Sequence, residues 1–340
     1  MKSDSNLERL VDAGHFVVTA ELGPPMSSDA DVIVEKAAIL RGYADAVNIT
    51  DCQTAVVRLS SIASAAILLR EGVEPVMQMT VRDRNRIAMQ ADILGAAALG
   101  IRNCLCIAGD HQSFGAAGKL KGHPGAKNVY DVDSIQLLSI LKKMRDEGLQ
   151  EGGDPLEAPT PLFIGAAWTP MGDPVDFRVV RLAKKVAAGA DFIQTQGIYD
   201  VKGFAEIMKG VRQRGLHEQT AILAGIIVPK SAGMLRYMNS SVAGVSVPEE
   251  LIQRFPKTKK DASPAEKKEA RAESEEIGKR IAVELIEQVR QIKGVRGVHI
   301  QAIEWEPAVP DIVKAAGLVP RPPVSPQDAG GPDEPADRGA

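Results

Sequence analysis

The stretch FVVTAELGPPMSSDADVIVEKAAILRGYADAVNIT, residues 16–50, contains a strand pattern, a helix pattern and a second strand pattern. Its two ends, FVVTAEL and AVNIT, are short runs rich in apolar and β-branched residues. Between them, DVIVEKAAILRGY spaces its apolar residues as a helix does. A strand, a helix and a second strand in this order form a β–α–β unit with parallel strands. The stretch therefore predicts a parallel sheet covered by helices.

The same pattern recurs along the rest of the chain, with helical segments between further strand-like runs. Six more runs follow the first two: VMQMT (76–80), CLCIAGD (104–110), LFIGAAW (162–168), FIQTQ (192–196), AILAGIIV (221–228) and GVHIQAI (297–303). Strands that alternate with helices in this number close into a barrel more readily than they form an open sheet. We therefore predict an α/β fold, a (β/α)₈ TIM barrel, with residues 1–319 as a single catalytic domain.

Three segments depart from the regular alternation. SPAE (263–266) is a capping box with proline at the first helical position, and it opens a charged helix of about thirty residues, to Lys293, before the last strand. Residues 115–127 are rich in Gly, Lys and Ala and predict a long loop after the fourth strand. Residues 320–340 have a Pro-rich and Gly-rich composition typical of disorder, so we predict a disordered C-terminal tail.

The composition points to a small-molecule ligand. A hydrophobic fraction of 44% and a net charge of −3 are those of an ordinary globular protein with a large core. Lys and Arg (41) are outnumbered by Asp and Glu (44), so no nucleic-acid partner is predicted. The N-terminus lacks an apolar signal core, and no apolar run approaches the ~18 residues of a membrane span. We expect a cytoplasmic protein without a membrane partner.

Metal and nucleotide motifs are absent from the sequence. There is no GxGxxG after a strand, no Walker loop and no HExxH, and the five histidines show no ligand spacing. Cys104 and Cys106 would share one face of a strand, but no second pair of ligands completes a metal site. We interpret them as buried core residues and predict no metal.

Polar residues stand at the carboxyl ends of the predicted strands, where barrels place their active sites. They are Glu21, Thr50, Asp51, Gln78, Thr80, Asp110, Trp168, Thr169, Gln196 and Glu304 to Glu306. Glu21, between VVTA and LGPP, is the best candidate for a general acid, because apolar surroundings favour the protonated form of a carboxyl group. The alternative is a strand-end carboxylate that faces solvent.

At these strand ends the chain resembles the methylenetetrahydrofolate reductase family of flavin-dependent barrels, from about residue 17 to about residue 321. Four motifs carry the resemblance: TAELGPP (19–25), TVRDRNRIAMQADILGAAALGIRNCLCIAGD (80–110), NVYDVDSIQLL (128–138) and RLAKKVAAGADFIQTQ (181–196). Their joint spacing over some three hundred residues is specific, whereas TAELGPP alone would be a weak signal.

The resemblance implies roles for individual residues. Glu21 would be the catalytic proton donor, Asp110 a second catalytic residue near the flavin and the pterin, and Gln196 a substrate-binding residue. FAD contacts are implied at the following positions: Thr50, Gln78, Gly109, Asp110, Tyr130, Ala166, Trp168 and Lys185. For two of these a plain structural role is the alternative, since Tyr130 would also serve as a loop anchor and Lys185 as a helix-surface ammonium.

The activity implied by the resemblance is flavin-dependent reduction of methylenetetrahydrofolate to methyltetrahydrofolate in one-carbon metabolism. The substrate would be a folate-type pterin, and we expect a homo-oligomer. The chain departs from the family at Gln78, where a His is common, at Ala108, where an Arg is often found, and in AIEWEP (302–307), where many members have an Asn-Arg pair. That pair helps substrate or nicotinamide to bind, so the electron donor is NADH or a partner protein.

Two alternatives from other classes stay open. In the first, the chain is a pterin-binding barrel that hands a methyl group to a partner without a flavin. In the second, it is an electron-relay subunit that is active only with a partner subunit.

Overall fold

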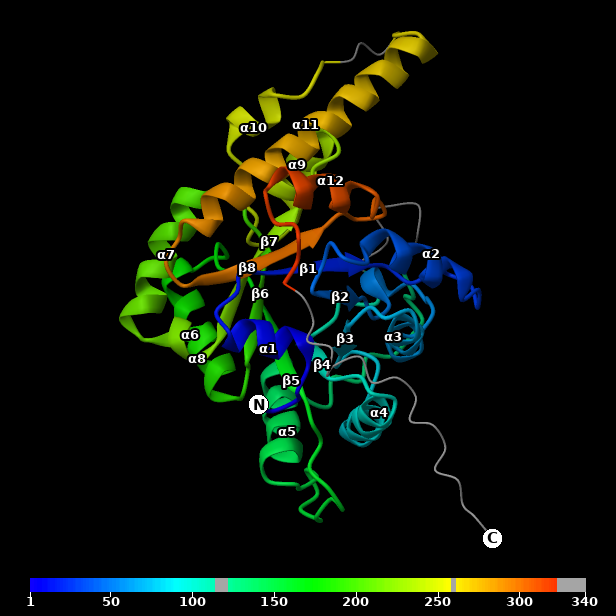
Figure 1. The fold of residues 1–340 in the computed structure, drawn as a ribbon, viewed down its shortest axis with the longest axis vertical. Helices are drawn as coiled ribbons and strands as arrows, with labels where there is room; N and C mark the ends of the chain where they lie inside the picture. Colours follow the sequence, from blue (N-terminus) through cyan, green and yellow to red (C-terminus); the bar gives the residue numbers. More distant parts are fainter. Residues whose placement is uncertain (114–121, 258–260, 323–340) are drawn as a thin grey trace.

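The computed structural model describes residues 1–113, 122–257 and 261–322, and these residues form a closed barrel of parallel strands within a layer of helices (Figure 1). The strands follow one another in sequence order around the barrel, and β1 pairs with β8. They are β1 Val17–Leu22, β2 Ala46–Ile49, β3 Pro75–Thr80, β4 Asn103–Ile107, β5 Phe163–Trp168, β6 Phe192–Gly197, β7 Ala221–Ile227 and β8 Val295–Gln301. The predicted (β/α)₈ barrel is confirmed.

Helices lie between the strands and cover the outside of the barrel. They are α1 Asn6–Asp12, α2 Asp31–Leu40, α3 Ser61–Arg70, α4 Arg86–Ala98, α5 Ser134–Asp146, α6 Val175–Ala187, α7 Val201–Gln213, α8 Leu216–Gln219, α9 Ala232–Ser241, α10 Glu249–Gln253, α11 Pro264–Arg290 and α12 Ala308–Ala315. A 3₁₀ turn, η1 Gln53–Ala55, follows β2. Most of the core lies between the outward faces of the strands and these helices.

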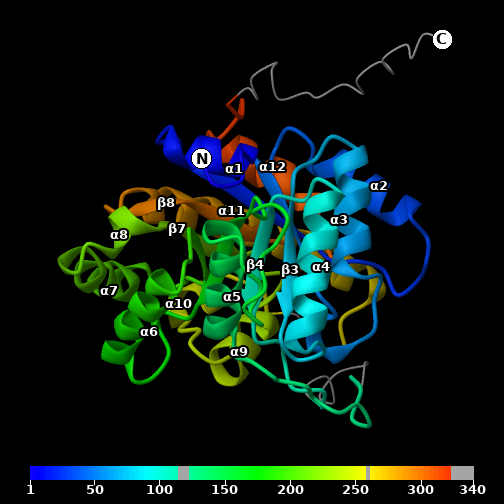
Figure 2. The same cartoon turned by 90° about the horizontal axis from the view of Figure 1, so that it is seen from below.

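Helix α1 closes the N-terminal end of the barrel. Leu7 and Leu10 pack against inward-facing apolar residues, among them Phe163 and Phe192, whose rings stack with centroids 5.2 Å apart. The Glu74 carboxylate accepts hydrogen bonds of 2.6 and 2.9 Å from the first two backbone N–H groups of α1, which have no partner within the helix. Figure 2 shows α1 at one end of the barrel and α9 at the other. The mouth is therefore the end opposite α1.

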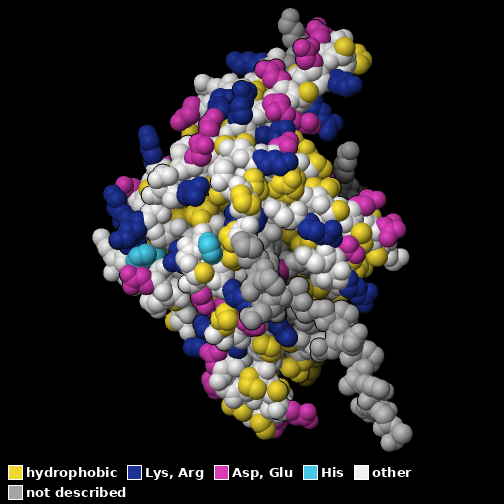
Figure 3. Space-filling model, viewed as in Figure 1, with side chains coloured by type: hydrophobic (Ala, Val, Ile, Leu, Met, Phe, Trp, Pro, Cys, Tyr) yellow, Lys and Arg dark blue, Asp and Glu magenta, His cyan; other side chains and the backbone are white. Residues whose placement is uncertain are grey.

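The predicted charged helix before the last strand is α11. Ser263 and Glu266 form the expected capping box, and Pro264 is the first helical residue. The N-terminal half of α11 projects from the barrel beside α10 (Figure 1), and Figure 3 shows acidic and basic side chains mixed along it. In the described part of the chain, no helix is long and apolar enough to span a membrane.

The described chain continues three residues beyond the predicted domain boundary at residue 319. Arg321 forms an ion pair of 2.5 Å with the buried Asp45 and donates to the Phe16 carbonyl at 3.0 Å. The rest of the predicted tail, residues 323–340, lies outside the described residues, as do residues 115–121 of the predicted loop. Residues 320–322 thus belong structurally to the barrel.

Gly165 provides a test of packing inside the barrel. A β-carbon at Gly165 of β5 would overlap the ring of Phe192 on the neighbouring strand. We expect Gly165→Ala to lower the free energy of unfolding by about 1–3 kcal/mol, because overfilling a packed core displaces its neighbours. Gly95 in α4 has open space around it, so Gly95→Ala should instead stabilise the protein by about 0.5–1 kcal/mol. Urea denaturation measures both, and equal effects of the two variants would contradict this account.

Candidate active site

The mouth of the barrel is built on backbone that is strained in the segments after β2 and β4. Three residues after β2 have positive φ angles, Cys52 (47°), Thr54 (55°) and Ala55 (58°), and Tyr130 after β4 has a φ of 41°. Each such conformation costs a non-glycine residue about 1–3 kcal/mol and persists only where neighbouring contacts impose it. Strained backbone of this kind clusters at functional sites, so these loops are the first place to look.

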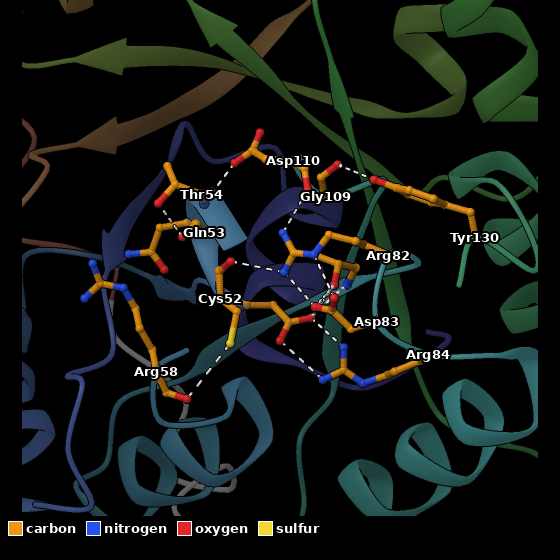
Figure 4. A network of polar contacts seen from close by, with 12 residues as sticks. Cys52, Gln53, Thr54, Arg58, Arg82, Asp83, Arg84, Gly109, Asp110 and Tyr130 are labelled. Atoms are coloured by element: carbon orange, nitrogen blue, oxygen red, sulfur yellow. Dashed lines mark hydrogen bonds and ion pairs between the residues drawn. The ribbon is translucent and has the colours of Figure 1, made fainter. Parts of the chain in front are cut away.

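The buried guanidinium of Arg82 joins the loops that follow β2, β3 and β4. It donates to the Cys52 carbonyl at 3.1 Å and to the Asp110 carbonyl at 3.0 Å, and it also binds the Asp83 carboxylate (Figure 4). The planar fork of arginine suits such simultaneous contacts. Arg82 therefore fixes the three loops relative to one another.

A second ion pair holds Asp51 at the end of β2. The Asp51 carboxylate accepts from Arg84 at 2.7 Å and from the backbone N–H and the hydroxyl of Thr80 at 2.9 and 3.0 Å. Burial by itself lowers the pKa of Arg84, but its bonds to Asp51 and Asp92 outweigh burial and raise it. Asp51 thus joins the end of β2 to Thr80 and Arg84.

Gly109, Asp110 and Tyr130 lie together beside this network. Gly109 has a φ of 83°, and a β-carbon there would come within 3.0 Å of Thr80 and 3.1 Å of Arg82, so only glycine fits. The Tyr130 hydroxyl donates to the Gly109 carbonyl at 3.3 Å, while its side chain is 40% exposed. One carboxylate oxygen of Asp110 accepts from the Thr54 backbone N–H at 3.0 Å. The structure brings these three predicted residues to one side of the mouth.

Glu21 projects into the mouth from the end of β1. Side chains alternate along a strand, so Glu21 shares the inward direction of Val17, which belongs to the cluster inside the barrel. Its side chain is 18% exposed, and its Oε2 lies 3.4 Å from Gln301 Nε2 and 3.9 Å from His299 Nε2, both on β8. Glu21 is thus partly covered while still accessible to a ligand.

Two more predicted residues share this inward direction by the same alternation: Gln78 is two residues beyond the inward Val76, and Thr50 is four beyond Ala46. Gln196 lies within a bulge of β6, between Gln194 and Gly197, so alternation from Phe192 does not fix its direction. The Thr50 hydroxyl donates to the Gln53 side chain at 2.8 Å, and the Gln196 side-chain oxygen accepts from the Gly197 N–H at 3.0 Å. Polar groups of β1, β2, β3 and β8 therefore converge on the mouth, and Gln196 stands at the carboxyl end of β6.

Ala166 and Trp168 do not join these residues. Both belong to the core between the strands and the helices, because β5 alternates and its inward positions are Phe163, Gly165 and Ala167. The indole N–H of Trp168 donates to the Arg178 carbonyl in α6 at 2.9 Å. The two side chains predicted to form this wall therefore lie on the outer face of β5, toward α6.

Lys185 of α6 lies against the outside of β5, where its ammonium donates to the Ala167 carbonyl. Burial, and then the nearby Arg181, lowers its pKa to about 8. A lysine poised in this way is charged at neutral pH and loses its charge just above it. Burial also raises the pKa of Cys106, which is held in the core with Cys104. Within the described residues, no group of three or more His, Cys, Asp or Glu is placed to hold a metal ion.

Sequence reasoning missed Arg82, Thr54, His299 and Gln301. Arg82 is one of three arginines in TVRDRNR, and the sequence does not show which of them is buried. The fold shows that Arg82 is buried between loops. His299 and Gln301 were detectable, because both alternate with outward apolar residues in GVHIQAI and fall on the inward side of the last strand.

The fold and the site define a class: a parallel (β/α)₈ barrel whose polar residues gather at the carboxyl ends of the strands, as in barrel enzymes. Residues 6–317 match the family model described as methylenetetrahydrofolate reductase. The chain therefore belongs to the methylenetetrahydrofolate reductase family, and the resemblance found in the sequence is confirmed.

Relatives with assigned names support this family. "Methylenetetrahydrofolate reductase 2" of Schizosaccharomyces pombe is 31% identical over 175 residues, which are 46% of this chain and 25% of that protein. "Probable methylenetetrahydrofolate reductase (NADPH)" of Caenorhabditis elegans is 20% identical over 263 residues, 76% of this chain and 34% of that protein. The chain thus aligns with about a third or less of the length of these relatives.

Among solved structures, an uncharacterized protein from Clostridium thermocellum has the same fold. It matches with a TM-score of 0.58 and 14% identity, over 92% of this chain and 99% of that one. Its title states that it binds two copies of 5-methyl-5,6,7,8-tetrahydrofolic acid.

The Arg82 network predicts a specific loss of order. Arg82→Lys removes the fork that reaches the Cys52 and Asp110 carbonyls together, so the free energy of unfolding should fall by about 1–3 kcal/mol. Amide hydrogen exchange should accelerate in residues 52–55 and 109–113. The matched control is Arg86→Lys, which alters an exposed ion pair with Asp131 and should leave the stability nearly unchanged. Unchanged exchange in the Arg82 variant would show that other contacts hold these loops.

Proposed function

We propose that the chain reduces methylenetetrahydrofolate to methyltetrahydrofolate with the help of a bound FAD. The observation on which the proposal rests is the placement of Glu21 in a chain of this family. Its carboxyl group points into the polar mouth and is partly covered, and among the residues that the structure describes no Lys or Arg side chain forms an ion pair with it. A carboxyl group in such a place is suited to give a proton to a ligand in the mouth.

The residues near Gly109 fit a flavin. The direction that a β-carbon of Gly109 would take is filled by Thr80 and Arg82, and because glycine has no side chain, a flat ring can approach the other side of its backbone closely. The half-exposed ring of Tyr130 stands beside it as an apolar surface for stacking. We propose that these two residues, with Thr50, Gln78 and Asp110, hold the flavin ring and that Lys185 attracts its phosphate or ribose. Bound FAD would supply the hydride that the reduction requires.

The chain's own residues would then prepare the one-carbon unit for reduction. Glu21 in its protonated form donates to the nitrogen that leaves when the five-membered ring of methylenetetrahydrofolate opens. The positive charge that develops on the remaining one-carbon unit is stabilised by Asp110, whose second carboxylate oxygen is not used by Thr54. Gln196 orients the pterin through hydrogen bonds to its edge. Electrons would come from NADH or from a partner protein.

A second candidate function has one observation in its favour. The Clostridium thermocellum protein with this fold is described as binding methyltetrahydrofolate, the product of the proposed reaction. A barrel that binds methyltetrahydrofolate and passes the methyl group to a partner would need no flavin. The two functions differ in colour: a purified protein that is yellow, with absorbance near ~450 nm, supports the reductase. A colourless protein that takes up no FAD but binds methyltetrahydrofolate would favour methyl transfer.

Glu21→Gln tests the proposed acid. Glutamine keeps the shape of the side chain but cannot donate a proton as an acid, so FAD binding should be retained. Reoxidation of the dithionite-reduced flavin by methylenetetrahydrofolate should slow by about 10²-fold or more. Stopped-flow absorbance measures this step without regard to the natural electron donor. Glu157→Gln, at an exposed carboxylate, is the control. Reoxidation at the wild-type rate in Glu21→Gln would move the acid to Asp110 or Glu304.

Lys185 should make FAD binding depend on pH. Its ammonium attracts phosphate only while protonated, and the lowered pKa of about 8 means that the free protein loses this charge as the pH rises through 8. The dissociation constant of FAD should therefore increase by up to about 10-fold between pH 7 and pH 9. Lys185→Ala should weaken binding at pH 7 and flatten this dependence, whereas Lys184→Ala, at an exposed neighbour, should do neither. Fluorescence titration with FAD measures both effects; a steep dependence that persists in Lys185→Ala would assign it to another group.

A further inference from the structure

A chain of buried polar side chains lies beneath Glu21 inside the barrel. Thr19 of β1, Asn48 of β2, Gln194 of β6 and His299 of β8 all face inward and are at most 2% exposed. Burying a polar group without a hydrogen bond costs several kcal/mol, so a layer of four such residues needs internal partners. Apolar residues fill the inward positions between this layer and α1.

The four side chains bond to one another in a continuous path. The amide groups of Asn48 and Gln194 exchange two hydrogen bonds of 2.6 and 2.9 Å. The Gln194 amide nitrogen also donates to the Thr19 hydroxyl oxygen at 3.1 Å, and that oxygen lies 2.9 Å from Nδ1 of His299. The other ring nitrogen, Nε2, lies 3.9 Å from Oε2 of Glu21. The path thus crosses the barrel and ends at the proposed acid.

Thr19 lets His299 keep its partners in both protonation states. The Thr19 hydroxyl can donate to Nδ1 of His299 at 2.9 Å or to the Val298 carbonyl at 3.4 Å. In the first arrangement the imidazole is neutral and its proton is on Nε2. In the second, Nδ1 has a proton and donates to Thr19. In the first arrangement, and in the second when the ring is charged, an N–H group on Nε2 faces Glu21.

We infer that His299 is the positioning residue for Glu21. Its Nε2–H directs the carboxyl group into the mouth and stabilises the carboxylate that is left after Glu21 has given up its proton. The separation of 3.9 Å is longer than a hydrogen bond, and such contacts often tighten when the substrate is bound. This inference rests on the proposed role of Glu21, and its alternative is that His299 only fills the barrel interior.

The contact itself is tested on the ligand-free protein. In a ¹⁵N-histidine spectrum of the five histidines, His299 is assigned by the signal that His299→Asn removes. We expect the Nε2 resonance of His299 to move in Glu21→Gln, and its preference for the Nε2–H tautomer to weaken in Thr19→Val, while the other four histidines stay unchanged. An unmoved Nε2 resonance in Glu21→Gln would overturn the inference, whatever the barrel binds.

The consequence for the reaction is tested with two replacements of His299. Asparagine keeps a partner for Thr19 but does not reach Glu21, whereas glutamine places an amide N–H near the position of Nε2. We expect His299→Asn to slow reoxidation of the reduced flavin by methylenetetrahydrofolate about 10-fold or more, and His299→Gln to restore most of the rate. FAD binding should be the same in both. His15→Asn, at an exposed histidine, should react as the wild type does.

Each outcome decides a different question. If both His299 variants react at the wild-type rate, or if they lose thermal stability equally and glutamine restores nothing, His299 is a filler of the interior and the inference is overturned. If the wild-type protein binds no FAD and does not react with methylenetetrahydrofolate, the proposed function fails. In that case the nitrogen spectrum still decides whether His299 holds Glu21.

Discussion

Closure of the parallel barrel is the constraint on which the rest of the structure depends. Once β1 pairs with β8, every strand presents alternate residues to a confined interior, and a shift by one residue would exchange inside for outside. Toward α1 the inward positions are apolar and packed, in the middle they form a bonded polar layer, and at the mouth they are polar and accessible. The polar residues of the site therefore continue the same inward-facing rows of residues that form the apolar and polar layers inside the barrel.

The loops at the carboxyl ends of the strands are subject to a second constraint, which is the free-energy cost of strained backbone. The left-handed residues after β2 keep their conformation because Arg82 binds the carbonyl of Cys52 and the carboxylate of Asp110 binds the N–H of Thr54. These contacts join residues that are 30 and 56 positions apart in the sequence. The same contacts that compensate the strain also set where Gly109 and Asp110 stand.

The alternation of strand and helix patterns was enough to predict the barrel and its eight strands. The SPAE motif predicted the capping box of α11. Glu21 and Asp110 could be proposed from their positions at strand ends, whereas Gly109 and Tyr130 were proposed from the resemblance to the family. Ala166 and Trp168 were assigned to the wrong face of β5. One inward position of this strand is Gly165, and because glycine has no side chain, the sequence of the strand did not show which face points inward. The role of Arg82 was not predicted because it consists of hydrogen bonds to carbonyl groups in loops that are distant in the sequence, and no local sequence pattern shows such bonds.

The pairing of β1 with β8 also bears on how the chain is made. β1 can pair with β8 only after residues 295–301 have left the ribosome. Arg321, which is made later still, forms its ion pair with Asp45 beside β1. Until then the edges of β1 and of the most recently made strand are unpaired, and open strand edges are templates for association with other chains. An unpaired β1 edge is therefore a site of association with other chains until β8 has been made.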